Sequence, residues 1–129
     1  MYHVLTPDFR FSDDRGMLVQ LVHGGYTQVN VVTTKRGVVR GNHYHKLCRE
    51  AFYVISGSVN VILTAGGKRG ETMFSAGDFF EIPPMVLHEM SYPEDCVMVA
   101  LYDRPVEDEN GDKDIHTPEP DDELWKVGG

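Results

Sequence analysis

Two histidines separated by one residue, His43 and His45, are followed five positions later by Glu50. If this segment is extended, alternate side chains point to the same face, so the two imidazoles project together and Tyr44 points to the other side. Two imidazoles with a nearby carboxylate suit a divalent metal. They also suit proton transfer on a small molecule. The segment is therefore a candidate for either chemistry.

Composition narrows the classes of partner. The chain has 129 residues and a formal net charge of −8, from 20 acidic and 12 basic residues. This balance disfavours nucleic acid and anionic membranes as partners. No apolar run reaches the roughly 18 residues that a membrane span needs. The first residues have neither a basic n-region nor an apolar h-region, so we expect no secretory signal and a cytoplasmic location.

Two cysteines, Cys48 and Cys96, form neither a CxxC motif nor a disulfide framework. We expect two reduced, buried thiols. Because Cys48 lies between His45 and Glu50, a ligand role for it stays open.

Short runs of β-branched and apolar residues, separated by glycine- and proline-containing turns, fill the chain up to residue 102. Before residue 103 no window shows the 3.6-residue period of an amphipathic helix. Residues 1–16 are rich in Asp, Pro and Arg and are expected to be loop, and Leu124 and Trp125 are expected to pack back onto the body. The expected strands are 17–22, 27–34, 38–45, 51–55, 58–64, 71–75, 79–82, 86–90 and 96–102.

This pattern predicts an all-β sandwich or barrel, whose interior mouth can hold one ligand. We expect a single domain over residues 1–129, with the barrel at about 16–103 and a polar C-terminal tail at 104–129. Because open β-sheet edges are commonly closed by pairing, we also expect a homodimer.

The histidine-containing segment and a second segment resemble the two signature motifs of the cupin superfamily, whose fold is a double-stranded β-helix (jelly-roll) barrel. Met85 departs from the second motif, where a glycine is usual, and Tyr92 stands where an asparagine is usual. The matching positions are Gly37, His43, His45, Glu50 and Gly57 in the first motif and Gly77, Pro83 and His88 in the second.

The resemblance implies that His43, His45, Glu50 and His88 take the positions of the family's metal ligands. Three neutral imidazoles and one carboxylate suit a divalent metal, Zn before Fe, Mn, Ni or Cu, and leave coordination positions open. The alternative is that these side chains line the pocket without a metal, bonded to one another or to substrate.

A narrower resemblance concerns the segments 14–16, 28–31 and 35–44. They look like the cupin branch that acts on nucleotide-activated deoxyhexoses, which includes the dTDP-4-keto-6-deoxyhexose 3,5-epimerases and 3,4-ketoisomerases. The form of residues 41–45 with Glu50 and Phe52 resembles the metal-binding cupin domain of bifunctional capsular-polysaccharide enzymes, where it is fused to a reductase. The 129 residues leave no room for a reductase, so we expect only the cupin half of such chemistry.

That branch implies removal of a proton beside a ketone, which needs a base and a group that stabilises the enolate. Arg40 or a metal could stabilise the enolate oxygen. Arg15, Arg36 and Arg40 could bind a diphosphate, and Asn42 lies in the same substrate-binding segment. The candidates that return the proton on the opposite face are Tyr44, Tyr53 and Tyr92.

The identity of the base is open. In the metal-free epimerases the first histidine of the motif, here His43, is the catalytic base. An imidazole that binds a metal through its basic nitrogen cannot also be a free base, so the base would then be another residue. Glu89 is a candidate, although alternation aims it away from the pocket and an exposed carboxylate is the alternative. Asp14 is either a pocket residue or part of a polar turn.

The sequence therefore predicts a metal-dependent epimerase or isomerase of a nucleotide-linked keto-deoxysugar in surface-polysaccharide biosynthesis. A cupin dioxygenase with a redox metal is the first alternative. A non-enzymatic module that binds a metal or a sugar is the second.

Overall fold

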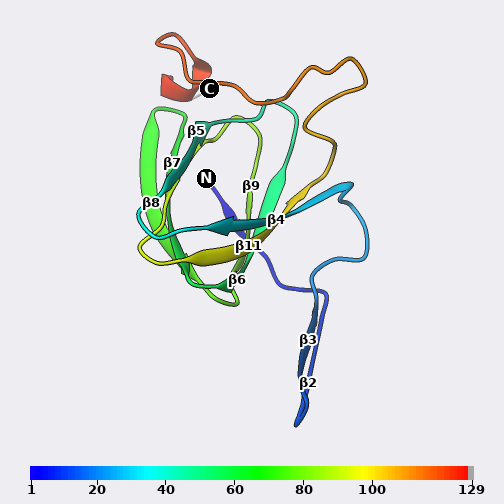
Figure 1. Ribbon diagram of the computed structural model, residues 1–129. Helices are drawn as coiled ribbons and strands as arrows, with labels where there is room; N and C mark the ends of the chain where they lie inside the picture. Colours follow the sequence, from blue (N-terminus) through cyan, green and yellow to red (C-terminus); the bar gives the residue numbers. More distant parts are fainter. Residues whose placement is uncertain (128–129) are drawn as a thin grey trace.

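The computed structural model describes residues 1–127, which contain eleven β-strands and one short 3₁₀ helix joined by turns and loops (Figure 1). None of these residues forms a helix long and apolar enough to cross a membrane. The elements are β1 (His3–Val4), β2 (Phe9–Asp13), β3 (Gly16–Gln20), β4 (Gln28–Thr34), β5 (Val39–His43), β6 (Glu50–Ser56), β7 (Ser58–Ala65), β8 (Lys68–Ser75), β9 (Phe79–Ile82), β10 (Leu87–Ser91), β11 (Cys96–Tyr102) and η1 (Glu123–Trp125).

Nine strands form two sheets that curve around a common interior (Figure 1). The five-stranded sheet has the order β1-β9-β6-β11-β4, and the four-stranded sheet has the order β5-β10-β7-β8. All the pairs are antiparallel. The predicted all-β jelly-roll barrel is confirmed.

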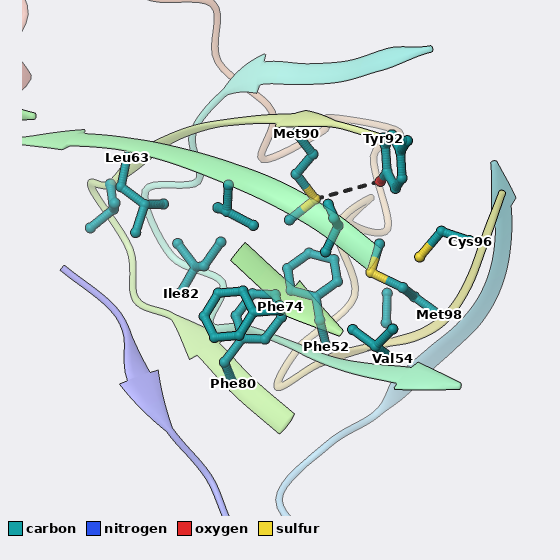
Figure 2. Packing of buried hydrophobic residues seen from close by; sticks show 14 residues of the cluster. Phe52, Val54, Leu63, Phe74, Phe80, Ile82, Met90, Tyr92, Cys96 and Met98 are labelled. Carbon is teal, nitrogen blue, oxygen red and sulfur yellow. Dashed lines mark hydrogen bonds between the residues drawn. The ribbon is translucent and has the colours of Figure 1, made fainter. Parts of the chain in front are cut away.

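The core fills the space between the sheets because each strand alternates apolar and polar side chains. On β7, Val59, Val61 and Leu63 are at most 1% exposed, whereas Asn60 and Ile62 are partly exposed. Figure 2 shows the residues of the two sheets meeting in this interior. The rings of Phe74 and Phe80, one from each sheet, stack with centroids 3.8 Å apart.

The expectation of loop over residues 1–16 is wrong, because two strands lie there. β1 adds to the five-stranded sheet beside β9. β2 pairs with β3 in a separate hairpin that projects away from the barrel (Figure 1). The alternation of Phe9 and Phe11 with polar residues is a strand signal that the Asp- and Pro-rich surroundings obscured. We call this hairpin, residues 9–20, the arm.

The C-terminal segment, residues 103–127, packs back onto the barrel through Leu124, as expected, whereas Trp125 remains 42% exposed. The side chain of Leu124 is 1% exposed and lies in η1. It forms a small cluster with Tyr44 and Leu87, with Met85 at its edge. The segment therefore packs against β7, against the start of β10 and against Tyr44, the residue that follows β5.

The glycine in the turn between β6 and β7 is expected to matter more for stability than the glycine between β8 and β9. Gly57 has φ +81°, and a Cβ there would lie 2.0 Å from the carbonyl oxygen of Asp95. Gly77 has φ +93° and nothing within 4 Å of such a Cβ. We expect Gly77→Ala to cost about 1–2 kcal/mol, the left-handed penalty alone, and Gly57→Ala to cost at least about 1–3 kcal/mol more because the backbone must shift. Urea unfolding of both variants measures the difference, and equal losses would contradict the close approach.

Candidate functional site

His43, His45, Glu50 and His88 converge, although they come from three strands and a loop. One ligand atom from each lies within 4.8 Å of the others. His43 ends β5, Glu50 begins β6 and His88 lies in β10. His45 follows β5 in the segment of residues 44–49, which we call the His45 loop. Three of the four side chains are buried, and His43 is partly exposed.

The pairing of β5 with β10 brings two of the imidazoles together. His43 and His88 are register partners, and the register shifts between His88 and Glu89. Gly41, with φ +92°, lies at this irregularity, and a Cβ there would be 2.8 Å from the carbonyl oxygen of His88. The glycine therefore allows the two backbones to approach closely. The rings of His43 and His88 lie with centroids 4.6 Å apart.

Hydrogen bonds to backbone carbonyls orient two of the rings. The Nδ1–H of His45 donates to the carbonyl oxygen of Asp114 at 2.5 Å, and the Nδ1–H of His88 donates to that of Val86 at 3.2 Å. Their Nε2 atoms face Glu50 Oε1, at 3.1 Å from His45 and 3.6 Å from His88. The basic nitrogens and the carboxylate therefore point into the same space.

Burial and the close packing of charges shift the pKa values of the four groups. Burial and the neighbouring imidazoles of His88 and His45 lower the pKa of His43 to about 4. Burial also lowers the pKa of His88. Burial opposes the shift at His45, but hydrogen bonds to Glu50 and to the Asp114 carbonyl raise the pKa of His45. At Glu50, burial is outweighed by the hydrogen bond from His45 and the charge of His88, so its pKa is lowered.

The donor set fits a divalent metal. Three imidazole nitrogens and one carboxylate are ligands that Zn, Fe, Mn and Ni accept. The carbonyl hydrogen bonds of His45 and His88 leave Nε2 of each ring as the atom available for a ligand bond, as in many metal sites of proteins. The low pKa of His43 keeps its imidazole neutral near pH 7, which metal ligation requires.

Three members of this cluster, His43, Glu50 and His88, line a cavity of about 240 Å³ inside the barrel. Arg40, Tyr92 and Tyr102 add polar groups to it. Burial and the carboxylate of Glu50 raise the pKa of Tyr102. Burial also raises the pKa of Tyr92, against the opposing effects of Thr34 and Arg40. Both phenols are therefore protonated near neutral pH. The apolar lining is Val32, Phe52, Met90, Met98 and Ala100, with Gly41 at the edge.

Arg40 and Tyr92, both candidates from the sequence, reach this cavity. The Nε of Arg40 donates to Thr34 Oγ1 at 2.8 Å, and its Nη2 donates to the Thr33 carbonyl oxygen at 3.2 Å. The hydroxyl of Tyr92 points toward Met90 Sδ, 3.6 Å away (Figure 2). Arg40 also lines a second hollow of about 560 Å³ on the outside, next to Lys35.

The other candidates lie outside the cavity lining. Tyr44, the first residue of the His45 loop, is buried in a separate cluster with Leu87 and Leu124. Arg36 donates its backbone N–H to Asp95, and its side chain lies outside both hollows. Arg15 lies on the arm and pairs with Asp13. Tyr53, Glu89, Asn42 and Asp14 also lie outside the lining of the cavity.

Two residues of the site were not among the sequence candidates. Tyr102 is the register partner of Glu50 at the end of β11, and inward alternation with Met98 and Ala100 is the signal that could have identified it. Asp114 accepts hydrogen bonds from the backbone N–H groups of Lys46, Leu47 and Cys48. No local pattern marks Asp114, because its partners are backbone groups more than sixty positions away.

The backbone conformation of Met85 explains how the chain departs from the cupin motif at this position. It has φ +65°, the left-handed conformation that a glycine adopts most easily. Its backbone N–H donates to the His45 carbonyl oxygen at 2.7 Å. The position thus keeps the backbone that glycine would provide, at a strain of about 1–2 kcal/mol.

Comparisons with known proteins agree with this fold. The family model described as "Polysaccharide biosynthesis C-terminal domain" matches residues 11–104, and the chain belongs to this family. A search of the curated proteins found no match.

Several solved structures are similar to this chain. The sugar 3,4-ketoisomerase QdtA from Thermoanaerobacterium thermosaccharolyticum, in complex with TDP, is 21% identical, with a TM-score of 0.74 and coverage of 85% of each chain. dTDP-4-dehydrorhamnose 3,5-epimerase from Sulfolobus tokodaii is 21% identical, with a TM-score of 0.64 and coverage of 72% of this chain and 65% of that chain. The capsular polysaccharide assembling protein CapF from Staphylococcus aureus is 24% identical, with a TM-score of 0.65 and coverage of 89% of this chain and 33% of that chain. These proteins are of the cupin branch that the sequence motifs predicted.

The thiol of Cys48 is not part of the ligand cluster, and burial predicts that neither cysteine reacts in the native protein. The Cys48 Sγ faces the carbonyl oxygen of Arg104 at 3.7 Å. Burial and the neighbouring Asp114 raise its pKa to about 12, and burial raises the pKa of Cys96. Because both are at most 2% exposed and protonated, we expect Ellman's reagent to label neither thiol in the native protein at pH 8 and both in 6 M guanidinium. Fast labelling of one native thiol would contradict this burial.

Proposed function

We propose that this member of the polysaccharide biosynthesis C-terminal domain family epimerises or isomerises a nucleotide-linked keto-deoxysugar with a divalent metal, in surface-polysaccharide synthesis. The observation that carries the proposal is the barrel cavity, in which the imidazole–carboxylate cluster faces Arg40, Tyr92 and Tyr102. Two of the similar structures are those of a sugar 3,4-ketoisomerase and a dTDP-4-dehydrorhamnose 3,5-epimerase, which supports the same substrate class.

The size of the cavity favours a sugar ring inside and a nucleotide outside. Its volume of about 240 Å³ is below the ~300–1,000 Å³ of pockets that enclose drug-sized ligands. Arg40 lies at the wall shared with the outer hollow of about 560 Å³, and Lys35 lines that hollow. These two cations suit the diphosphate that links sugar to nucleoside. Of the three arginines that the sequence suggested for this role, Arg40 is the one that lines the two hollows.

His43, His45, Glu50 and His88 would hold the metal, which would supply a Lewis acid for a substrate oxygen. The chain's own residues then perform the proton transfers. Proton removal beside the ketone places negative charge on the ketone oxygen, and the guanidinium of Arg40 can stabilise that charge. With the imidazoles occupied as ligands, the titratable groups left in the cavity lining are Arg40, Tyr92 and Tyr102.

We assign the proton transfers to these two phenols. Tyr92 would take the proton from carbon in its minor phenolate form, because the charge of Arg40 and the hydrogen bond with Thr34 both favour that anion, although burial raises the pKa overall. Tyr102 is next to Glu50, which disfavours its anion and makes it the better proton donor. Glu89 and Tyr44 are no part of this proposal, since neither lines the cavity.

The test joins metal analysis with solvent exchange. We expect tag-free protein to contain about one equivalent of divalent metal and to wash deuterium from D₂O into the carbons beside the ketone of a dTDP-4-keto-6-deoxyhexose. Arg40→Ala and Tyr92→Phe should each slow exchange by about 10²-fold or more. Arg36→Ala, which removes an arginine outside both hollows, is the matched control and should exchange at the wild-type rate.

Other outcomes would contradict this function. Metal and sugar-nucleotide binding without wash-in would favour a non-enzymatic binding module. Iron with dioxygen uptake would favour a dioxygenase. Protein without metal that still exchanges deuterium would show that the cluster acts as a set of free bases.

We also propose that two copies form a homodimer through the arm and the outer face of β4. Both strands of the arm pair only with each other among the described residues, and they expose Phe9, Phe11, Met17 and Leu18. A lone two-stranded hairpin is marginally stable in water, so these side chains need a partner surface. On β4, an edge strand, Val29 and Val31 are 60% and 69% exposed. A second copy would cover both surfaces at once, as a two-fold interface requires.

Sedimentation velocity tests the interface. We expect a dimer at micromolar concentrations and expect Phe11→Asp and Val31→Asp each to weaken it by at least about tenfold, because a charge would be buried unpaired. Met73 is about as exposed as Phe11, at 54% against 51%, but lies on β8 of the other sheet, so Met73→Asp should leave the dimer unchanged. A wild-type monomer, or a dimer weakened equally by all three changes, would contradict this interface.

A further inference from the structure

Asp114, in the C-terminal segment, contacts the metal-ligand cluster directly. Its carboxylate accepts three consecutive backbone N–H groups of the His45 loop, from Lys46 at 2.8 Å and from Leu47 and Cys48 at 2.9 Å each. Its backbone carbonyl oxygen accepts the Nδ1–H of His45 at 2.5 Å. One residue therefore contacts both the loop backbone and the imidazole that the loop carries.

Flanking contacts fix the position of Asp114 itself. His116 forms a β-bridge with Tyr44, with two backbone hydrogen bonds of 3.0 Å. The Nε2–H of His116 also donates to Asp114 Oδ1 at 2.9 Å. At the far end of the His45 loop, the backbone N–H of Arg49 donates to Asp103 Oδ1 at 2.9 Å. The segment thus binds both ends of the loop, with Asp114 in the middle.

These contacts determine which nitrogen of His45 can bind a ligand. Because a carbonyl oxygen only accepts, the proton of the neutral imidazole stays on Nδ1, and the lone pair stays on Nε2. That nitrogen lies 3.1 Å from Glu50 Oε1, inside the cluster. The three N–H bonds to the carboxylate fix the backbone on which this ring is mounted.

We propose that Asp114 is a positioning residue of the metal site, which orients His45 and sets its tautomer so that the C-terminal segment forms part of the site. Residues that orient metal-binding histidines in this way change metal affinity by about 10–100-fold when substituted. The inference rests on the proposed function in one respect, namely that the cluster binds a divalent metal.

The test compares Asp114→Asn with Asp112→Asn. The first keeps the size of the side chain but removes the charge, and an amide cannot accept all three N–H groups as a carboxylate does. The second removes the same charge from an exposed position in the same segment, where its backbone bonds only within its own turn. Zinc affinity is measured by competition with a chromophoric chelator, on protein stripped of metal and then reloaded. Each variant is first checked for a native far-UV spectrum.

For Asp114→Asn we expect the zinc Kd to rise about 10–100-fold, and for Asp112→Asn we expect it to stay within about twofold. Asp114→Glu, which keeps the carboxylate, should recover part of the lost affinity. A loss caused only by lower stability would disappear at a temperature well below each variant's Tm, and it would follow Tm across the three variants. Equal zinc affinity in Asp114→Asn and wild type would overturn the proposal.

A second readout needs no metal. In ¹⁵N-edited spectra of the metal-free protein, we expect Nδ1 of His45 to be protonated, and the amides of Lys46, Leu47 and Cys48 to be protected from hydrogen exchange. Both signatures should weaken in Asp114→Asn and persist in Asp112→Asn, and their persistence in Asp114→Asn would overturn the proposal. Wild-type protein that shows both signatures but binds no zinc would overturn the metal-dependent function and leave the orientation of His45 by Asp114 supported.

Discussion

A buried carboxylate, Glu50, is the constraint on which the site depends. Its side chain is 5% exposed, and an ionised carboxylate at that depth is stable only when paired and hydrogen-bonded. His45 and His88 provide that pairing from one side, and Tyr102 lies beside it as its register partner. The His45 loop fixes the position of His45, the irregularity between β5 and β10 fixes His88, and the pairing of β6 with β11 fixes Tyr102. The fold around Glu50 therefore holds its three neighbours in place.

The same constraint separates two kinds of chemistry within one cavity. Around Glu50 the imidazoles face one another, and burial lowers the pKa values of His43 and His88. Such rings are better ligands than proton carriers near pH 7. Away from Glu50, Arg40 provides a positive charge beside Tyr92. The candidates for the base are therefore the residues that line the cavity. Neither Glu89 nor Asp14 is one of them.

Sequence patterns were informative where side chains alternate along strands. The one-residue spacing of His43 and His45 suggested that the two imidazoles face the same side, and the resemblance to the cupin motifs added Glu50 and His88 as the other expected ligands. The patterns failed where position depends on the path of the chain. Arg15 lies on a hairpin that leaves the barrel, and nothing in residues 12–16 distinguishes that turn from one beside the cavity. Asp114 could not be found because it binds backbone N–H groups, which every residue except proline has.

The C-terminal segment, the part with the weakest sequence signal, contacts both the His45 loop and the turn that precedes β10. Asp114 binds the His45 loop. Leu124 packs with Tyr44 and Leu87, and Met85 lies against this cluster just ahead of the strand that bears His88.

Met85 keeps a left-handed backbone that costs energy for a residue with a Cβ. Such strain persists only where the surroundings fix the conformation, and here they do so through the Leu124 cluster and the hydrogen bond to the His45 carbonyl. The segment that covers the barrel is thus also what makes a non-glycine residue tolerable at this position of the motif.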